Sequence, residues 1–220
     1  MSAREKILAR IRKAQGRGVS RPSQAELEAV QTYLRAHPRG TLPRVEGDLK
    51  TRFRARAESM QSTTEEIERM SEVPAAVARY LKANDVPLSG CVWPQLAHLD
   101  WKGAGLALEP RGAKDGDPVG VTGAFAAIAE TGTLVLASGP DTPATASLLP
   151  ETHVAVVSVG RVVAHMEQAW DLAREELREL PRAINFVSGP SRTADIDQTI
   201  VLGAHGPYRV HVVLVRQEQS

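Results

Sequence analysis

Apolar and polar residues follow different patterns before and after about residue 89. Over the first 60 residues, charged and apolar residues alternate at helical spacing between Pro and Gly interruptions. Ser23 and Glu26 have the spacing of a capping box, which predicts a helix that begins there. That helix is expected to end near His37, because Pro38 disfavours helical geometry at the residue before it. Two further helices are predicted, over residues 48–60 and 74–83.

Beyond residue 89, short apolar runs alternate with helical patterns. Candidate strands cover residues 91–93, 133–137, 154–159, 184–188 and 208–215. One helical stripe lies between two of them and comprises Val163, Met166, Trp170, Ala173, Leu177 and Leu180. A run as apolar as 154–157 is typical of a strand that helices cover on both faces. The sequence therefore predicts a three-layer α/β/α fold with a largely parallel sheet, in which residues 210–215 form either a central strand or an antiparallel partner.

Charge divides the chain into a basic and an acidic part. Residues 1–60 hold 14 Lys and Arg against 6 Asp and Glu, and residues 61–220 hold 13 against 20. We predict a basic helical arm over residues 1–45 and an α/β domain over residues 46–220. Because the arm lacks interleaved aromatic residues, an acidic partner protein or the acidic α/β domain itself is a better partner for it than nucleic acid.

Several classes of protein are disfavoured by what the sequence lacks. Charges interrupt the apolar residues at the amino terminus, and no run approaches the roughly 18 apolar residues of a membrane span, so we expect a cytoplasmic protein without such a span. Cys91 is the one cysteine and lies in an apolar run, so this chain alone cannot ligate an iron–sulfur cluster. The sequence has no nucleotide-binding glycine fingerprint and no paired histidines, and no bound cofactor or metal is predicted.

Three polar, glycine-containing segments border the predicted strands: residues 123–133, 188–197 and 202–207. We expect them to converge on one cleft, because open α/β sheets bind ligands beyond the carboxyl ends of their strands. In the second segment, Gly189 permits a tight turn, and Ser191, Arg192 and Thr193 could bind a phosphate or carboxylate. The alternative is that Thr193 caps a short helix, Asp195 stabilises its first turn, and Arg192 pairs with a surface carboxylate.

Two residues are candidates for proton transfer or nucleophilic attack. Glu130 lies between a stretch that reads as helical and the strand that begins at Thr133, and it could act as nucleophile or general base. The alternative is a helix-terminal carboxylate that is hydrogen-bonded to backbone. His205, beside Gly206 in a turn, could donate to an anion or transfer a proton, although a loop histidine is more often structural.

These segments resemble the lactate utilization protein C family, whose domain is shared with lactate utilization protein B. The matching stretches occur in family order over about the last 100 residues: 122–124, 127–134, 149–150, 189–196 and 203–207. Ala204 departs from the family pattern, where we would expect valine. The resemblance implies a fold similar to the ribose-phosphate isomerase and coenzyme A transferase group.

The same resemblance implies a role beside two iron–sulfur partner proteins in converting L-lactate to pyruvate, with the clusters on the partners. We expect an accessory component with a cleft for a small anion, lined by Thr131, Gly132, Gly189, Ser191, Arg192, Thr193, Asp195 and Gly206. A second hypothesis is an independent enzyme on a phosphorylated or acyl substrate. In that case Glu130 would act as in coenzyme A transferases, whose Glu-Asn-Gly turn is similar to Glu130-Thr131-Gly132. A third hypothesis is a small-molecule-binding regulator.

Overall fold

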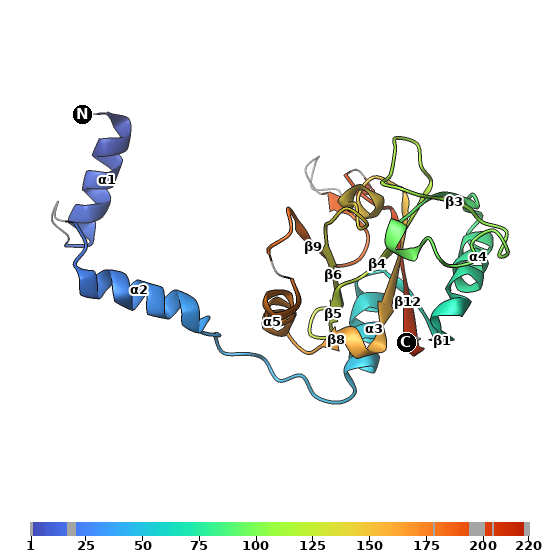
Figure 1. Cartoon of the computed structure of the whole chain (residues 1–220), viewed down its shortest axis with the longest axis horizontal. Helices are drawn as coiled ribbons and strands as arrows, with labels where there is room; N and C mark the ends of the chain where they lie inside the picture. The colour runs from blue at the N-terminus through green and yellow to red at the C-terminus, as the bar shows by residue number, and fades with distance from the viewer. Residues whose placement is uncertain (1, 17–20, 178, 194–200, 204, 218–220) are drawn as a thin grey trace. The chain divides into compact units, whose positions relative to one another are not determined.

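The chain divides into two compact units, Met1–Leu42 and Pro43–Ser220. The computed structural model describes residues 2–16, 21–177, 179–193, 201–203 and 205–217, with backbone alone at residues 193, 201 and 202. The first unit contains helices α1 (Ala3–Ala14) and α2 (Gln24–Ala36), drawn in blue in Figure 1. Both helices begin with a capping box, and α2 begins after Ser23 as predicted.

The second unit is built on a six-stranded parallel sheet. In spatial order its strands are β1 (Thr63–Arg69), β12 (Arg209–Gln217), β7 (Thr152–Ser158), β4 (Val119–Gly123), β2 (Ser89–Val92) and β3 (Ala107–Pro110). β12 pairs in parallel with β1 on one side and with β7 on the other. The final apolar run is therefore a central strand, because both of its neighbours satisfy its backbone groups.

A second, four-stranded sheet is formed by two strands that precede β7 in the chain and two that follow it. Its strands, in spatial order, are β8 (Val162–Val163), β5 (Ala126–Ile128), β6 (Thr133–Ala137) and β9 (Ile184–Val187). The helical reading of the stretch before Glu130 is wrong, because residues 126–128 form β5. The helix preference of alanine is weak, and pairing with β6 in a hairpin buries all three residues.

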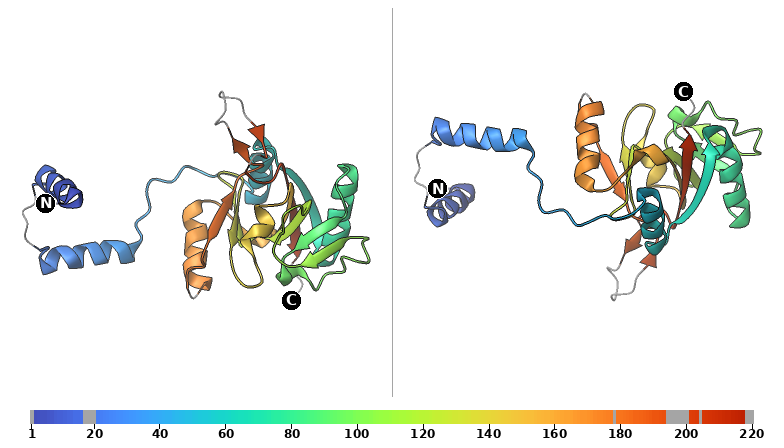
Figure 2. Two further views of the ribbon diagram at one scale, coloured as in Figure 1. Left: turned by 90° about the horizontal axis from the view of Figure 1, so that it is seen from above. Right: turned by 90° about the horizontal axis from the view of Figure 1, so that it is seen from below.

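The two sheets and the helices that cover them form layers (Figure 2). On one face of the large sheet, α4 (Val73–Ala83) packs through residues such as Leu81 against Val213 and Val215. On the other face lie α3 (Leu49–Ser59) and the second sheet, whose outer face packs against α5 (Met166–Glu176). The predicted α/β class is confirmed, and the closer similarity to the ribose-phosphate isomerase and coenzyme A transferase group stays a prediction.

The helical stripe predicted between two strands is confirmed only in its centre. Ala173 of α5 is buried, and the Trp170 ring lies 5.6 Å from that of Phe186. Val163 lies in β8 instead, and Met166 is 41% exposed. The helix ends at Glu176, before the last residue of the stripe, Leu180, which is 71% exposed. No helix in the described part of the chain combines the length and apolar character needed to cross a bilayer.

Two very different strands form the outer edges of the large sheet. β1 has the polar sequence TTEEIER, in which Ile67 alone is fully buried, and the apolar pattern did not predict it as a strand. Charged neighbours hold its side chains, for example Lys50 Nζ at 2.8 Å from Glu66 Oε1 and Arg216 Nη1 at 3.0 Å from Glu68 Oε1. At the opposite edge, β3 pairs with β2 and ends at Pro110.

We expect α1 and α2 to open before the α/β unit does. Neither helix has a buried residue, whereas every residue of β7 is buried. Isolated helices of this length are marginal in water, since tertiary packing supplies most helical stability. Amide hydrogen exchange followed by mass spectrometry should show α1 and α2 exchanging well before β7 and β12. Equal protection of α1 and β7 would contradict the expectation.

Two buried histidines lie inside the large sheet. His153 of β7 is hydrogen-bonded through Nε2 to Thr122 Oγ1 at 2.8 Å, and its Nδ1 has no partner. His211 of β12 is hydrogen-bonded through Nδ1 to Thr63 Oγ1 at 2.8 Å, and its ring stacks on Tyr80 with centroids 3.9 Å apart. Burial lowers the pKa of both imidazoles to about 4, so both are neutral at pH 7.

The free energy of unfolding should therefore fall as the pH drops below about 6.5, the ordinary histidine pKa. Below that pH the unfolded chain binds protons that the folded chain binds only near pH 4. The loss should approach about 3 kcal/mol for each histidine by pH 4. Urea unfolding at pH 7.5 and at pH 5 measures it. His98→Gln, at an exposed position, should leave the pH dependence unchanged, and an equal unfolding midpoint at both pH values would refute the expectation.

Candidate functional site

Two of the three predicted segments meet at the amino ends of β7 and β12. The Ser191 N–H donates to the Pro207 carbonyl at 2.9 Å, and the Gly203 N–H donates to the Ser191 carbonyl at 2.9 Å. Between them, β10 (Arg192–Thr193) pairs with β11 (Val201–Leu202) in antiparallel orientation. The second segment follows the carboxyl end of β9, as predicted, but both segments meet where β12 begins rather than at the carboxyl ends of the large sheet.

Gly189 and Arg192 lie against the carboxyl end of α3. Gly189 has a φ of 76°, and a Cβ there would lie 2.1 Å from the carbonyl oxygen of Met60. Only glycine fits this close approach between two backbone segments. Arg192 Nη2 donates to the same Met60 carbonyl at 3.1 Å, which places a cation at the negative end of the α3 dipole.

The Thr131-Gly132 turn reaches the same helix from the second sheet. A Cβ on Gly132, whose φ is 69°, would lie 2.4 Å from the backbone nitrogen of Ala57. The Thr133 hydroxyl is hydrogen-bonded to the hydroxyls of Thr131 and Ser188, at 2.7 and 2.6 Å. Residues from two predicted segments therefore converge on α3. We call Thr131, Gly132, Ser188, Gly189 and Arg192 the α3 cluster.

Glu130 points away from the α3 cluster, toward the first turn of α5. Its Oε2 is hydrogen-bonded to Nδ1 of His165 at 2.8 Å, and both side chains are mostly buried. A carboxylate near a helix amino terminus is stabilised by the helix dipole. Among the described residues, no hydrogen bond or ion pair joins Glu130 to Ser191, Arg192 or His205. Sequence reasoning missed His165, which is separated from Glu130 by 35 positions.

The remaining candidate residues lie outside both of these groups of contacts. His205 is exposed in a turn, and a Cβ on Gly206 would lie 3.2 Å from Cβ of Ser191. Thr193 pairs through its backbone with Val201. Asp195 lies outside the described residues. No group of three or more His, Cys, Asp or Glu side chains in the described part of the chain is arranged to hold a metal ion.

A cavity of about 310 Å³ lies where β2 and β4 end, and sequence reasoning did not find it. From β2 the chain leaves toward the sheet face that holds Leu96 and Trp101, and from β4 it leaves toward the second sheet. Such a switch point between adjacent strands is where open α/β sheets bind ligands. The residues lining it are Trp93, Gln95, Ala124, Phe125, Ala137, Ser138, Gly139, Thr142, Leu177 and Pro181.

The lining of this switch-point cavity favours an uncharged ligand. It contains no Lys, Arg, Asp or Glu among the described residues. The Trp93 indole is held in place because Nε1 donates to the Pro143 carbonyl at 3.0 Å. Ser138 Oγ accepts a hydrogen bond from the Ala183 N–H at 2.9 Å, and the Ser138 hydroxyl can donate one to a ligand. The only sequence signals for the cavity were an apolar strand that ends in Trp93 and the Thr122-Gly123-Ala124 motif.

Residues 117–215 match the model of the LUD domain family.

The chain's relatives include proteins named lactate utilization protein C. That of Bacillus subtilis (strain 168) is 40% identical over 100 residues, covering 44% of this chain and 42% of the relative. That of Exiguobacterium sp. is 36% identical over 142 residues, covering 63% of this chain and 61% of the relative. The chain thus matches less than two thirds of the length of either protein. These matches confirm the resemblance that the motifs indicate.

A crystal structure of a DUF162 family protein from Deinococcus radiodurans has the same fold. It superposes with a TM-score of 0.60 at 24% sequence identity, covering 79% of this chain and 99% of that chain. This similarity shows the fold alone.

If the α3 cluster binds an anion, Arg192→Ala should abolish phosphate binding at little cost in stability. The Arg192 side chain is exposed and donates one hydrogen bond to a carbonyl, so its loss should cost about 1 kcal/mol. The matched control is Arg69→Ala. Arg69 is exposed at the carboxyl end of β1, whereas Arg192 contacts Met60 just before β1 begins. Calorimetric phosphate titration and thermal unfolding of both variants provide the test. A loss of stability above about 3 kcal/mol would instead identify a structural arginine.

Proposed function

We propose that this protein is a cytoplasmic component of a lactate utilization system, which assists the oxidation of L-lactate to pyruvate. The observation that carries the proposal is the 36–40% identity, over 100 to 142 residues, to proteins named lactate utilization protein C. In this proposal, iron–sulfur partner proteins transfer the electrons. The protein itself binds a small anion at the α3 cluster.

The chemistry of its one cysteine supports clusters on partners rather than on this chain. Cys91 is fully buried in β2, and an iron–sulfur cluster needs several thiolates. Burial, with a smaller contribution from the Asp117 carboxylate, raises the pKa of the Cys91 thiol to about 11. The thiol is therefore protonated at neutral pH and is a poor metal ligand.

Lactate-dependent reduction of a dye by the co-purified native complex tests the proposal. Removing this chain should abolish or strongly lower the rate, and adding back the purified chain should restore it. The purified chain alone should be colourless and inactive, since it lacks the thiolates for a cluster. An unchanged rate without the chain, or a flavin or cluster absorption band in the purified chain, would refute the proposal.

The contact between Glu130 and His165 favours a second candidate function, an enzyme that acts on an acyl or phosphorylated substrate. A carboxylate that is oriented by a histidine could act as a nucleophile toward an acyl group. Exchange of labelled coenzyme A into an acyl thioester, with wild type and Glu130→Gln, tests this alternative. Activity that the substitution abolishes without lowering stability would support it. The absence of exchange would leave Glu130 as a residue that anchors α5.

A further inference from the structure

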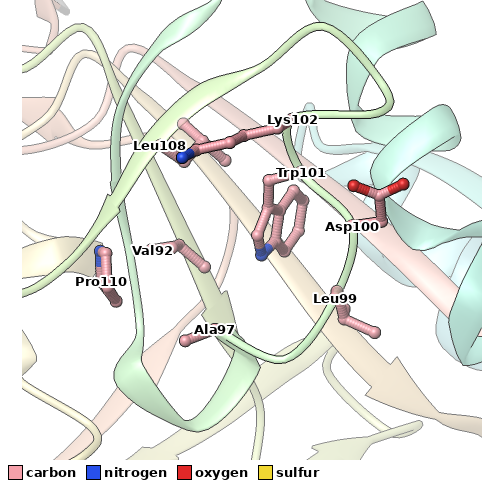
Figure 3. A pocket seen from close by; sticks show the side chains of 8 residues that line it. All are labelled: Val92, Ala97, Leu99, Asp100, Trp101, Lys102, Leu108 and Pro110. Atoms are coloured by element: carbon pink, nitrogen blue, oxygen red, sulfur yellow. The ribbon is translucent and has the colours of Figure 1, made fainter.

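A second cavity, separate from the α3 cluster, opens at the carboxyl ends of β2 and β3. It has a volume of about 240 Å³ and lies under the connection that joins these two strands. Most of its lining is apolar, as Figure 3 shows: Val92, Ala97, Leu99, Trp101, Leu108 and Pro110. Asp100 and Lys102, on either side of Trp101 in the chain, complete the lining. We call this the β2–β3 cavity.

The wall of the β2–β3 cavity is fixed by hydrogen bonds within the connection. Trp101 is 5% exposed, and its Nε1 donates to the Leu96 carbonyl at 2.9 Å. The Gly103 N–H donates to Asp100 Oδ1 at 2.8 Å, and a Cβ on Gly103 would collide with that carboxylate. The indole therefore does not have to move to accept a ligand, which lowers the cost of binding.

The two charged residues of this cavity are directed to opposite sides of Trp101. In Figure 3 the Lys102 side chain extends across the cavity toward Leu108, whereas the Asp100 carboxylate lies beyond the indole ring. Asp100 already accepts a backbone hydrogen bond, and within the described ranges no carboxylate forms an ion pair with Lys102. The cavity thus combines an apolar wall with one ammonium group available to a ligand.

We propose that the β2–β3 cavity binds a small monocarboxylate with an apolar body. The carboxylate pairs with the Lys102 ammonium, and the body lies against Trp101 and Leu108. A polar body would leave its hydrogen-bonding groups unsatisfied against this wall, and a second negative charge would lie unbalanced near Asp100. The proposal goes beyond the role in lactate utilization and does not depend on it.

Titration with 4-methylpentanoate, its uncharged amide and acetate tests this proposal on the full chain. The three tryptophan indole N–H resonances report the site of binding, after assignment by single Trp→Phe substitutions. We expect the acid to shift the Trp101 resonance and to bind about tenfold more tightly than the amide, because the amide lacks the charge-assisted hydrogen bond. Acetate should bind weakly, since it has almost no apolar surface to bury.

Lys102→Gln should weaken binding of the acid by about tenfold and leave binding of the amide unchanged. Lys82→Gln, an exposed lysine at the end of α4, is the matched control and should bind both probes like wild type. Because Lys102 is exposed, its substitution should not affect folding. Equal affinity for acid and amide, an unaffected Lys102→Gln variant, or binding that does not shift Trp101 would each overturn the proposal.

Discussion

The close packing of α3 against two glycine turns is the constraint on which the arrangement of this domain depends. Phe53 and Ala57 of α3 are fully buried in the core between the two sheets. Gly132 and Gly189 bring the second sheet into backbone contact with the same helix. A side chain at either position would collide with the backbone of α3 or its C-cap and push the helix and the second sheet apart. The helix therefore fixes where these turns of the second sheet can lie.

This constraint gives a structural reason for much of the motif pattern in the sequence. Gly132 and Gly189 are required by the approach of α3, whereas Gly206 only lies close to Ser191. The residues beside them, such as Thr131 and Arg192, are brought together by the same packing. A motif that has the pattern of a ligand site is thus also a packing contact of the core. Binding measurements are needed to separate the two roles.

The sequence predicted those parts of the fold that local physics determines. Ser23 begins its helix through a capping box, and β7 and β12 are apolar because other elements cover both of their faces. It could not predict β5, where alanines take strand geometry because β6 pairs with them. Nor could it predict β1, whose acidic side chains form ion pairs with basic side chains of α3 and β12. In the candidate site, the motif glycines could be placed near one another, whereas both cavities depend on how distant connections cross the ends of β2 and could not.

The two outer strands of the large sheet determine how another protein can attach to it. Pro110 lacks the N–H that an added strand would need, and the acidic side chains of β1 are already engaged by Lys50, Arg54 and Arg216. Extending the sheet by a further backbone is therefore unfavourable at either side. Both edges thus carry features that work against unwanted strand pairing and aggregation.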